Sequence, residues 1–120
     1  MIDYIIKSSG RIKYVEVCEN TVCLDSEEGA MDLTALCLEN GTDRLLLPGS
    51  NIGERFFDLK SGLAGAVLQK FSNYSVRMAA VIPREKLSGR FGEMALEANR
   101  GRNIRFATDK AEAVGWITGE

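Results

Sequence analysis

Short apolar runs alternate with amphipathic helical patterns along this chain, and this alternation limits the folds that it can adopt. The runs Arg44–Leu47 and Val76–Ile82 are bounded by turn residues and lack the alternating polarity of a half-exposed strand, which predicts buried parallel strands. Between them, apolar residues recur at steps of three and four, which predicts one long helix that ends near Tyr74. The apolar stripe of this helix consists of Phe56, Leu59, Leu63, Val67, Phe71 and Tyr74. A strand, a helix and a second buried strand in this order predict an α/β fold with a mostly parallel sheet.

The first part of the chain has the pattern of an antiparallel β-hairpin. Ile2–Lys7 and Arg11–Cys18 are predicted as strands, and Ser8-Ser9-Gly10 between them is rich in turn-forming residues. Glu19-Asn20 is predicted as a further turn, and Thr21–Leu24 as a short extended segment.

The remaining elements have start and stop signals of their own. Ser26 and Asp109 are predicted N-caps, because each precedes a helical pattern and carries a side-chain oxygen that accepts a hydrogen bond from the first turn. A further helix is predicted at Leu87–Arg100 and a strand at Ile104–Ala107. The expected fold is one α/β domain over residues 1–120, with about four to six strands, an N-terminal hairpin and about four helices.

Charge and hydropathy exclude several kinds of partner. The net charge is −2, and acidic and basic residues are interspersed, so the sequence has no basic stripe for nucleic acid. No apolar run reaches the length of about 18 residues that spans a membrane, and the N-terminus lacks the features of a signal peptide. We therefore expect a cytoplasmic protein without nucleic-acid or membrane partners.

The absence of histidine removes the most common general base and the most common metal ligand. Ser-His-Asp and Cys-His catalysis is excluded, and no catalytic residue is assigned, although carboxylate, lysine, tyrosine or cysteine chemistry stays open. Cys18, Cys23 and Cys37 lie in apolar contexts without the paired spacing of a zinc site. We expect these thiols to be buried, reduced and slow to react, and we expect no bound metal and no cofactor.

Three segments resemble bacterial proteins that are grouped as domain of unknown function 4180. These segments are Asp43–Leu47, Phe56–Ile82 and Leu96–Ile117, and the resemblance covers roughly residues 40–118 in matching order. The family has no assigned role, so this resemblance carries little information about function.

A more distant resemblance is to STAS domains, the anti-sigma-factor antagonist fold. Asp58, the run Ser61-Gly62-Leu63 and Gly65 are similar to the STAS pattern Asp-Ser-Ser-Gly-Leu-Gly, with one extra residue, and the order of strands and helices is similar too. In STAS antagonists a partner kinase phosphorylates a serine of this pattern at a helix N-terminus, and the resemblance implies that role for Ser61. Lys60 stands where the family more often has a serine.

The polar side of the long helical pattern is the predicted partner surface. It consists of Asp58, Ser61, Gly62, Gly65 and Gln69. Two glycines inside a helix cost about 1 kcal/mol each relative to alanine, so a compensating contact is expected. Three explanations stay open: tight packing within the chain, close approach of a protein partner, or a helix that begins only near Asp58 and places Ser61 in its first turn.

A second candidate site is the loop Pro48–Gly53, which follows a buried strand and precedes a helix. Ligands bind at this position in α/β sheets, and the loop contains Ser50 and Asn51. It has neither a GxGxxG nor a GxxxxGKS pattern. The alternative is an ordinary turn in which Asn51 caps the next helix and Glu54 completes a capping box.

These observations predict a non-enzymatic, STAS-like regulatory or protein-interaction module that binds a regulatory protein or associates with itself. The alternative is a protein that binds a small molecule, an anion or a nucleotide, or a minor enzyme that uses the loops at the carboxyl ends of the strands. A deep pocket that contains several of Ser50, Asn51, Asp58 and Ser61 favours this alternative, whereas a shallow, convex surface favours the interaction module.

Overall fold

The computed structural model describes residues 2–19 and 21–119, and its centre is a sheet of five strands in the order β1-β2-β3-β4-β5. β1 and β2 form the antiparallel hairpin, and each later strand runs parallel to the one before it. The strands are β1 (Tyr4–Ser9), β2 (Ile12–Val17), β3 (Arg44–Pro48), β4 (Arg77–Val81) and β5 (Ile104–Ala107). The predicted α/β class, with a mostly parallel sheet and an N-terminal hairpin, is confirmed.

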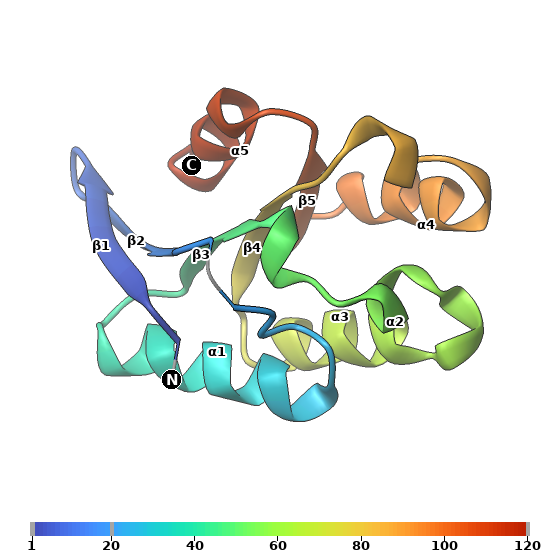
Figure 1. Cartoon of the computed structure of the whole chain (residues 1–120). Helices are drawn as coiled ribbons and strands as arrows, with labels where there is room; N and C mark the ends of the chain where they lie inside the picture. Colours follow the sequence, from blue (N-terminus) through green and yellow to red (C-terminus); the bar gives the residue numbers. More distant parts are fainter. Residues whose placement is uncertain (1, 20, 120) are drawn as a thin grey trace.

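Four helices cover one face of this sheet, and a fifth lies on the other face (Figure 1). The first four are α1 (Glu27–Glu39), α2 (Glu54–Phe57), α3 (Leu63–Asn73) and α4 (Gly89–Asn99). They share a face because neighbouring parallel strands follow one another along the chain, and each right-handed crossover places its helix on the same side. α5 (Lys110–Ile117) follows the last strand and packs on the opposite face. Within the described ranges no helix has the length and apolarity needed to cross a membrane.

The two faces of the sheet carry cores of different size. The larger core joins the strands to α1–α4, and its bulkiest members include Leu33, Leu45, Leu47, Phe56, Phe71 and Met78. The smaller core lies under α5 and joins Tyr14, Leu46, Ala79 and Ala107 to Ala113 and Ile117. β3 and β4 are therefore buried on both faces, which explains why the residues that follow Arg44 and Arg77 in these strands are all apolar.

The prediction of one continuous helix that ends near Tyr74 is wrong. The segment divides into α2, the 3-10 turn η2 (Leu59–Ser61) and α3, and Gly62 lies between η2 and α3 with a left-handed φ of 76°. A φ in this region suits glycine and ends the turn. The apolar stripe still points to the core on both sides of the break, except that Tyr74 stands at the end of α3 and is 51% exposed.

The predicted helix caps at Ser26 and Asp109 are confirmed. The Ser26 hydroxyl accepts from the Gly29 N–H at 3.1 Å, and the Asp109 carboxylate accepts from the Glu112 N–H at 2.8 Å. The predicted extended segment Thr21–Leu24 contributes only an isolated bridge between Leu24 and Ile52. Of the turn predicted at Glu19-Asn20, Asn20 lies outside the described residues.

Candidate functional site

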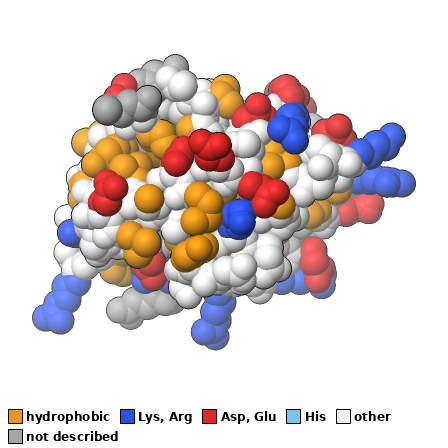
Figure 2. All heavy atoms as spheres, turned by 90° about the horizontal axis from the view of Figure 1, so that it is seen from below, with side chains coloured by type: hydrophobic (Ala, Val, Ile, Leu, Met, Phe, Trp, Pro, Cys, Tyr) orange, Lys and Arg blue, Asp and Glu red, His pale blue; other side chains and the backbone are white. Residues whose placement is uncertain are grey.

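The five residues of the predicted partner surface are all exposed and lie between the end of α2 and Gln69 in α3. We call this set the α3 surface: Asp58, Ser61, Gly62, Gly65 and Gln69. Figure 2 shows the molecule from below, on the side of α1 and α3, where hydrophobic side chains are separated by acidic and basic ones and no deep hollow is seen.

Ser61 and Asp58 shape the connection between α2 and α3. The Ser61 hydroxyl lies 2.7 Å from both the Arg55 and the Asp58 carbonyl oxygens, to which it donates, and it accepts from the Leu63 N–H at 3.2 Å. The Asp58 carboxylate accepts from the Lys60 N–H at 3.1 Å. Asp58 thus caps a 3-10 turn rather than an α-helix, and Ser61 stands at the end of that turn rather than in the first turn of a helix.

The two glycines of the α3 surface differ in whether the backbone conformation requires glycine. Gly62 has the left-handed φ already described, whereas Gly65 has an ordinary helical backbone. A Cβ atom added at either position would meet no atom within 4 Å. Tight packing within the chain, one of the three predicted explanations, therefore does not account for them, and the fold gives no reason for glycine at position 65.

The N-terminus of α3 is the electrostatically distinctive part of this surface. The first N–H groups of a helix have no partner inside the helix and carry the positive end of its dipole. The Ser61 hydroxyl accepts from Leu63, and the first turn of α3 contains no acidic side chain. Because Gly65 has no side chain, the backbone of this turn is open at the surface.

The loop residues Ser50 and Asn51 lie in different environments. Ser50 is exposed and lines a hollow of about 600 Å³ at the carboxyl ends of the parallel strands, together with Glu54, Lys86 and Thr108. Asn51 is 1% exposed, and its amide nitrogen donates to the carbonyl oxygens of Cys18 at 2.9 Å and Thr21 at 2.6 Å.

The predicted capping box at Asn51 is wrong. Gly53, not Asn51, stands at the N-cap of α2, and no side chain caps that helix. The Asn51 side chain turns back to hold the segment that follows β2, because the carbonyl groups of that segment are not bonded in a strand ladder.

The four polar candidates are not gathered in one pocket. Ser50 lines the hollow just described, and Asp58 lines a separate one of about 420 Å³ beside Lys60 and Phe57. Asn51 is buried in a structural role, and Ser61 lines neither hollow. The arrangement lacks the deep shared pocket that the small-molecule alternative requires of these residues.

Glu16 is a partly buried carboxylate that the sequence pattern does not single out. Its side chain is 13% exposed, and Oε2 accepts from Lys110 Nζ at 2.9 Å. Lys7 Nζ forms an ion pair with Oε1 at 3.1 Å. Burial raises the pKa of Glu16, but the contacts with Lys110 and Lys7 outweigh burial and hold the pKa below its ordinary value of 4.5.

Replacing Glu16 with glutamine is expected to reduce the acid sensitivity of the fold. Because the pKa of Glu16 is lowered in the folded state, its contribution to stability is present above the unfolded pKa and is lost as pH falls through the folded pKa. Urea unfolding should therefore show a smaller loss of unfolding free energy from about pH 7 to about pH 3 for Glu16→Gln than for the unchanged protein. Equal losses in the two proteins would contradict this assignment.

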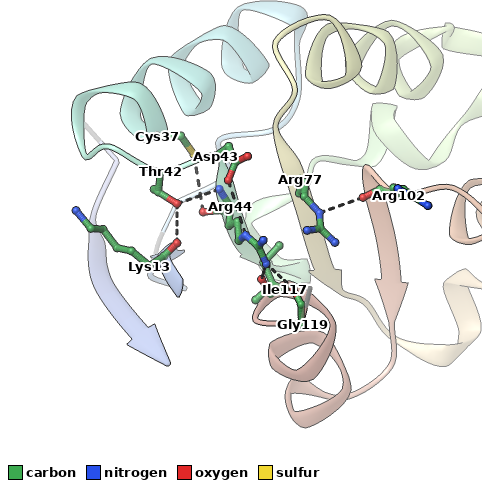
Figure 3. Close-up of polar contacts among 9 residues, drawn as sticks. All are labelled: Lys13, Cys37, Thr42, Asp43, Arg44, Arg77, Arg102, Ile117 and Gly119. Carbon is green, nitrogen blue, oxygen red and sulfur yellow. Dashed lines mark hydrogen bonds and ion pairs between the residues drawn. The ribbon is translucent and has the colours of Figure 1, made fainter. Parts of the chain in front are cut away.

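A group of arginines lies at the opposite, amino ends of the strands (Figure 3). Arg44 Nη1 donates to the Ile117 and Gly119 carbonyl oxygens at 2.7 and 2.6 Å, which fixes the end of α5 to β3. Arg77 Nε donates to the Arg102 carbonyl oxygen at 3.2 Å, and its guanidinium lies 5.0 Å from the centre of the Trp116 ring. Burial, and then the neighbouring positive charge of Arg44, lower the pKa of Arg77. These contacts give the arginines a structural role between the sheet and α5.

Of the three thiols predicted to be buried, the structure buries only Cys37. Cys37 is buried, and burial together with the negative charge of Asp43 raises its pKa to about 12. Cys23 is half-buried, and burial raises its pKa to about 11. Slow reaction with thiol reagents remains the expectation for these two. Cys18 is also half-buried. Within residues 2–19 and 21–119, no group of three or more Cys, Asp or Glu side chains is placed to hold a metal ion.

Comparisons with known proteins give one match. The model of a protein family described as "Domain of unknown function (DUF4180)" matches residues 9–117, which is most of the chain and includes every described helix and strand except most of β1. No curated protein and no solved structure matches the sequence.

Proposed function

This chain belongs to the DUF4180 family, and from that premise we propose that it acts as a non-enzymatic, STAS-like regulatory or protein-interaction module whose partner binds the α3 surface. Two features support the likeness to STAS domains. The fold begins with a hairpin and continues as alternating helices and parallel strands. The residues that resemble the STAS serine pattern lie together at the junction of η2 and α3.

The observation that carries the proposal is Gly65. It is exposed in a regular helix, its backbone does not require glycine, and no atom of the described chain approaches the place of its missing Cβ. Glycine disfavours a helix relative to alanine, so the residue lowers stability without a gain inside the chain. Close approach by a partner's backbone or anionic side chain supplies the missing reason.

Ser61 gives this surface a means of control. A phosphate on the hydroxyl would add nearly two negative charges beside the N-terminus of α3, where the helix dipole favours them. The same change would remove the proton that the hydroxyl donates to the carbonyl oxygens of Arg55 and Asp58. Phosphorylation would therefore reshape the α2–α3 connection and occupy the anion-accepting turn at the same time, and we expect it to release the partner.

Replacing Gly65 with leucine is expected to abolish partner binding while the fold stays intact. Because a side chain at this position points into open space, the unfolding free energy should change by less than about 1 kcal/mol. Ala111→Leu, which places the same leucine side chain at an exposed position of α5, is the matched control. Chemical unfolding measures stability, and titration of a partner captured by the unchanged protein measures binding.

Two results would contradict the proposal. One is a partner that binds Gly65→Leu and Ala111→Leu equally well. The other is a large loss of stability in Gly65→Leu, in the range of about 1–3 kcal/mol that overpacking causes, since this would place the residue inside the fold.

The hollow at the carboxyl ends of the strands favours a second candidate function. Ser50 and Thr108 line it with hydroxyl groups, and Lys86 lines it with an ammonium group that is paired with Glu54 at 3.1 Å. α/β proteins bind ligands at this end of the sheet. On this alternative the protein binds an anion or a nucleotide, or acts as a minor enzyme there. Titration with inorganic phosphate and with ADP, followed by NMR, tests it: shifts confined to residues around Ser50 and Lys86 favour the alternative over the interaction module.

A further inference from the structure

The two edges of the sheet differ in whether a side chain covers the strand backbone. At the β5 edge, the side chain of Asn99 lies against the strand: its Oδ1 accepts from the Phe106 N–H at 2.7 Å, and its Nδ2 donates to the Phe106 carbonyl oxygen at 3.1 Å. These are the two bonds that a neighbouring strand would make at this residue. Asn99 therefore closes part of the β5 edge to pairing with another chain.

The β1 edge has no such cover among the described residues. The Cys18 N–H bonds to the Asp3 carbonyl at 2.8 Å, and from there the backbone groups of β1 alternate in direction. Tyr4, Ile6 and Ser8 accordingly turn their N–H and C=O groups away from β2. β1 is the outermost strand on this side (Figure 1).

The side chains of β1 are unusually apolar for an open edge. Tyr4 is 37% exposed, Ile5 48% and Ile6 39%. Edge strands of monomeric proteins are commonly protected by charges, prolines or bulges, because an open apolar edge pairs with other strands. Lys7 follows these residues but is already held in the ion pair with Glu16.

We propose that β1 pairs antiparallel with β1 of a second copy of this chain, which gives a two-fold dimer with one continuous sheet. In the register that we assign, the two Ile5 residues face each other at the axis. Tyr4 then faces Ile6 of the second copy, and these two pairs exchange about four backbone hydrogen bonds through their outward-facing groups.

The sequence of β1 is complementary to itself in this register. Aromatic and β-branched residues make favourable cross-strand pairs, as Tyr4 and Ile6 do here. The register centred on Ile6 instead places Tyr4 opposite Ser8 and Ile5 opposite Lys7, which loses both Tyr4–Ile6 pairs.

This dimer is independent of the proposed function at the α3 surface. β1 lies at the free edge of the sheet, whereas the α3 surface belongs to helices that pack on its larger core. Failure of one proposal therefore leaves the other in place, and the variants used below leave Ser61 and Gly65 unchanged.

Cysteine crosslinking tests the register. Directly opposed residues of a non-hydrogen-bonded antiparallel pair have Cα atoms about 4.5 Å apart, which is within reach of a disulfide. Under mild oxidation, Ile5→Cys should form a covalent dimer at least about tenfold faster than Ile6→Cys, whose thiol would face Tyr4. The unchanged protein gives the background from the native cysteines. Faster crosslinking of Ile6→Cys would overturn the assigned register.

Sedimentation equilibrium tests the dimer itself. The unchanged protein should shift from monomer to dimer over about 10–500 µM, and Ile5→Lys should weaken association at least about tenfold, because it places like charges opposite each other at the axis. Leu38→Lys, at a residue of α1 that is 69% exposed, is the matched control and should associate as the unchanged protein does. A monomer throughout the range, or equal association of Ile5→Lys, would overturn the proposal.

Discussion

Replacing Asn51 with alanine is expected to lower the free energy of unfolding by about 3 kcal/mol, because it leaves two carbonyl groups without their donor. The amide nitrogen of Asn51 bonds to the Cys18 and Thr21 carbonyl oxygens at 2.9 and 2.6 Å. The residue is 1% exposed, so water does not easily replace the lost bonds. Urea unfolding of the two proteins measures the difference.

The surroundings of Asn51 explain why replacing this one side chain is expected to lower the unfolding free energy so strongly. The segment after β2 forms no strand ladder. The Asn51 backbone carbonyl, which alanine would keep, also accepts from the Cys23 and Leu24 N–H groups at 2.9 and 3.0 Å. One residue thus fixes both ends of this connection against the loop after β3.

The neighbouring Ser50 supplies the control for Asn51. Ser50 is exposed, and Ser50→Ala should change the unfolding free energy by less than about 0.5 kcal/mol. If Asn51→Ala changes the unfolding free energy as little as Ser50→Ala does, the Asn51 side chain does not hold the segment after β2. A role for this side chain in ligand binding would then regain support. If the expected difference is found, only Ser50 remains a ligand candidate in this loop.

The strands and caps could be predicted from the sequence because their causes are local or periodic. β3 and β4 are buried on both faces, so the positions that follow Arg44 and Arg77 in these strands are all apolar, and no long-range information is needed to recognise them. Ser26 and Asp109 cap helices through bonds to residues three positions further on, which a short motif already contains.

The break at Gly62 could not be predicted from periodicity. The apolar residues before and after it keep their steps of three and four, because both α2 and α3 pack against the same core. The left-handed turn between them changes the path of the backbone but not the side that faces inward. Periodicity reports burial, and here two helices joined by a turn produce the burial pattern of one helix.

The polar contacts of Glu16 and Asn51 could not be predicted from the sequence for a different reason. Glu16 bonds to Lys110, which is 94 residues away, and Asn51 bonds to residues at least 30 positions earlier. Pairs of this kind depend on the order of strands in the sheet, which sequence patterns leave open. The exposure of the α3 surface, in contrast, followed from its position opposite an apolar stripe.

Replacing Gly29 with alanine is expected to lower the unfolding free energy by about 3 kcal/mol or more, although alanine favours helices. Gly29 is buried in the first turn of α1, and a Cβ atom there would overlap the backbone carbonyl oxygen of Cys23. The carbon of the same carbonyl would lie at 3.3 Å. Relief of this overlap requires α1 to move away from the segment before it, because a backbone group cannot turn aside as a flexible side chain does.

Gly65→Ala is the matched control, because both glycines occupy the third helical position after their N-caps, Ser26 and Gly62. With no atom within 4 Å of the added carbon, Gly65→Ala should raise the unfolding free energy by up to about 1 kcal/mol. The same substitution at equivalent helical positions should thus have opposite signs. The fold itself would then require glycine at position 29. A stabilising Gly65→Ala would show that the fold does not require glycine at position 65, and that this residue has a role other than stability. If Gly65→Ala destabilised the protein as Gly29→Ala does, an internal contact would explain both glycines, and the α3 surface would lose its main support as a partner site.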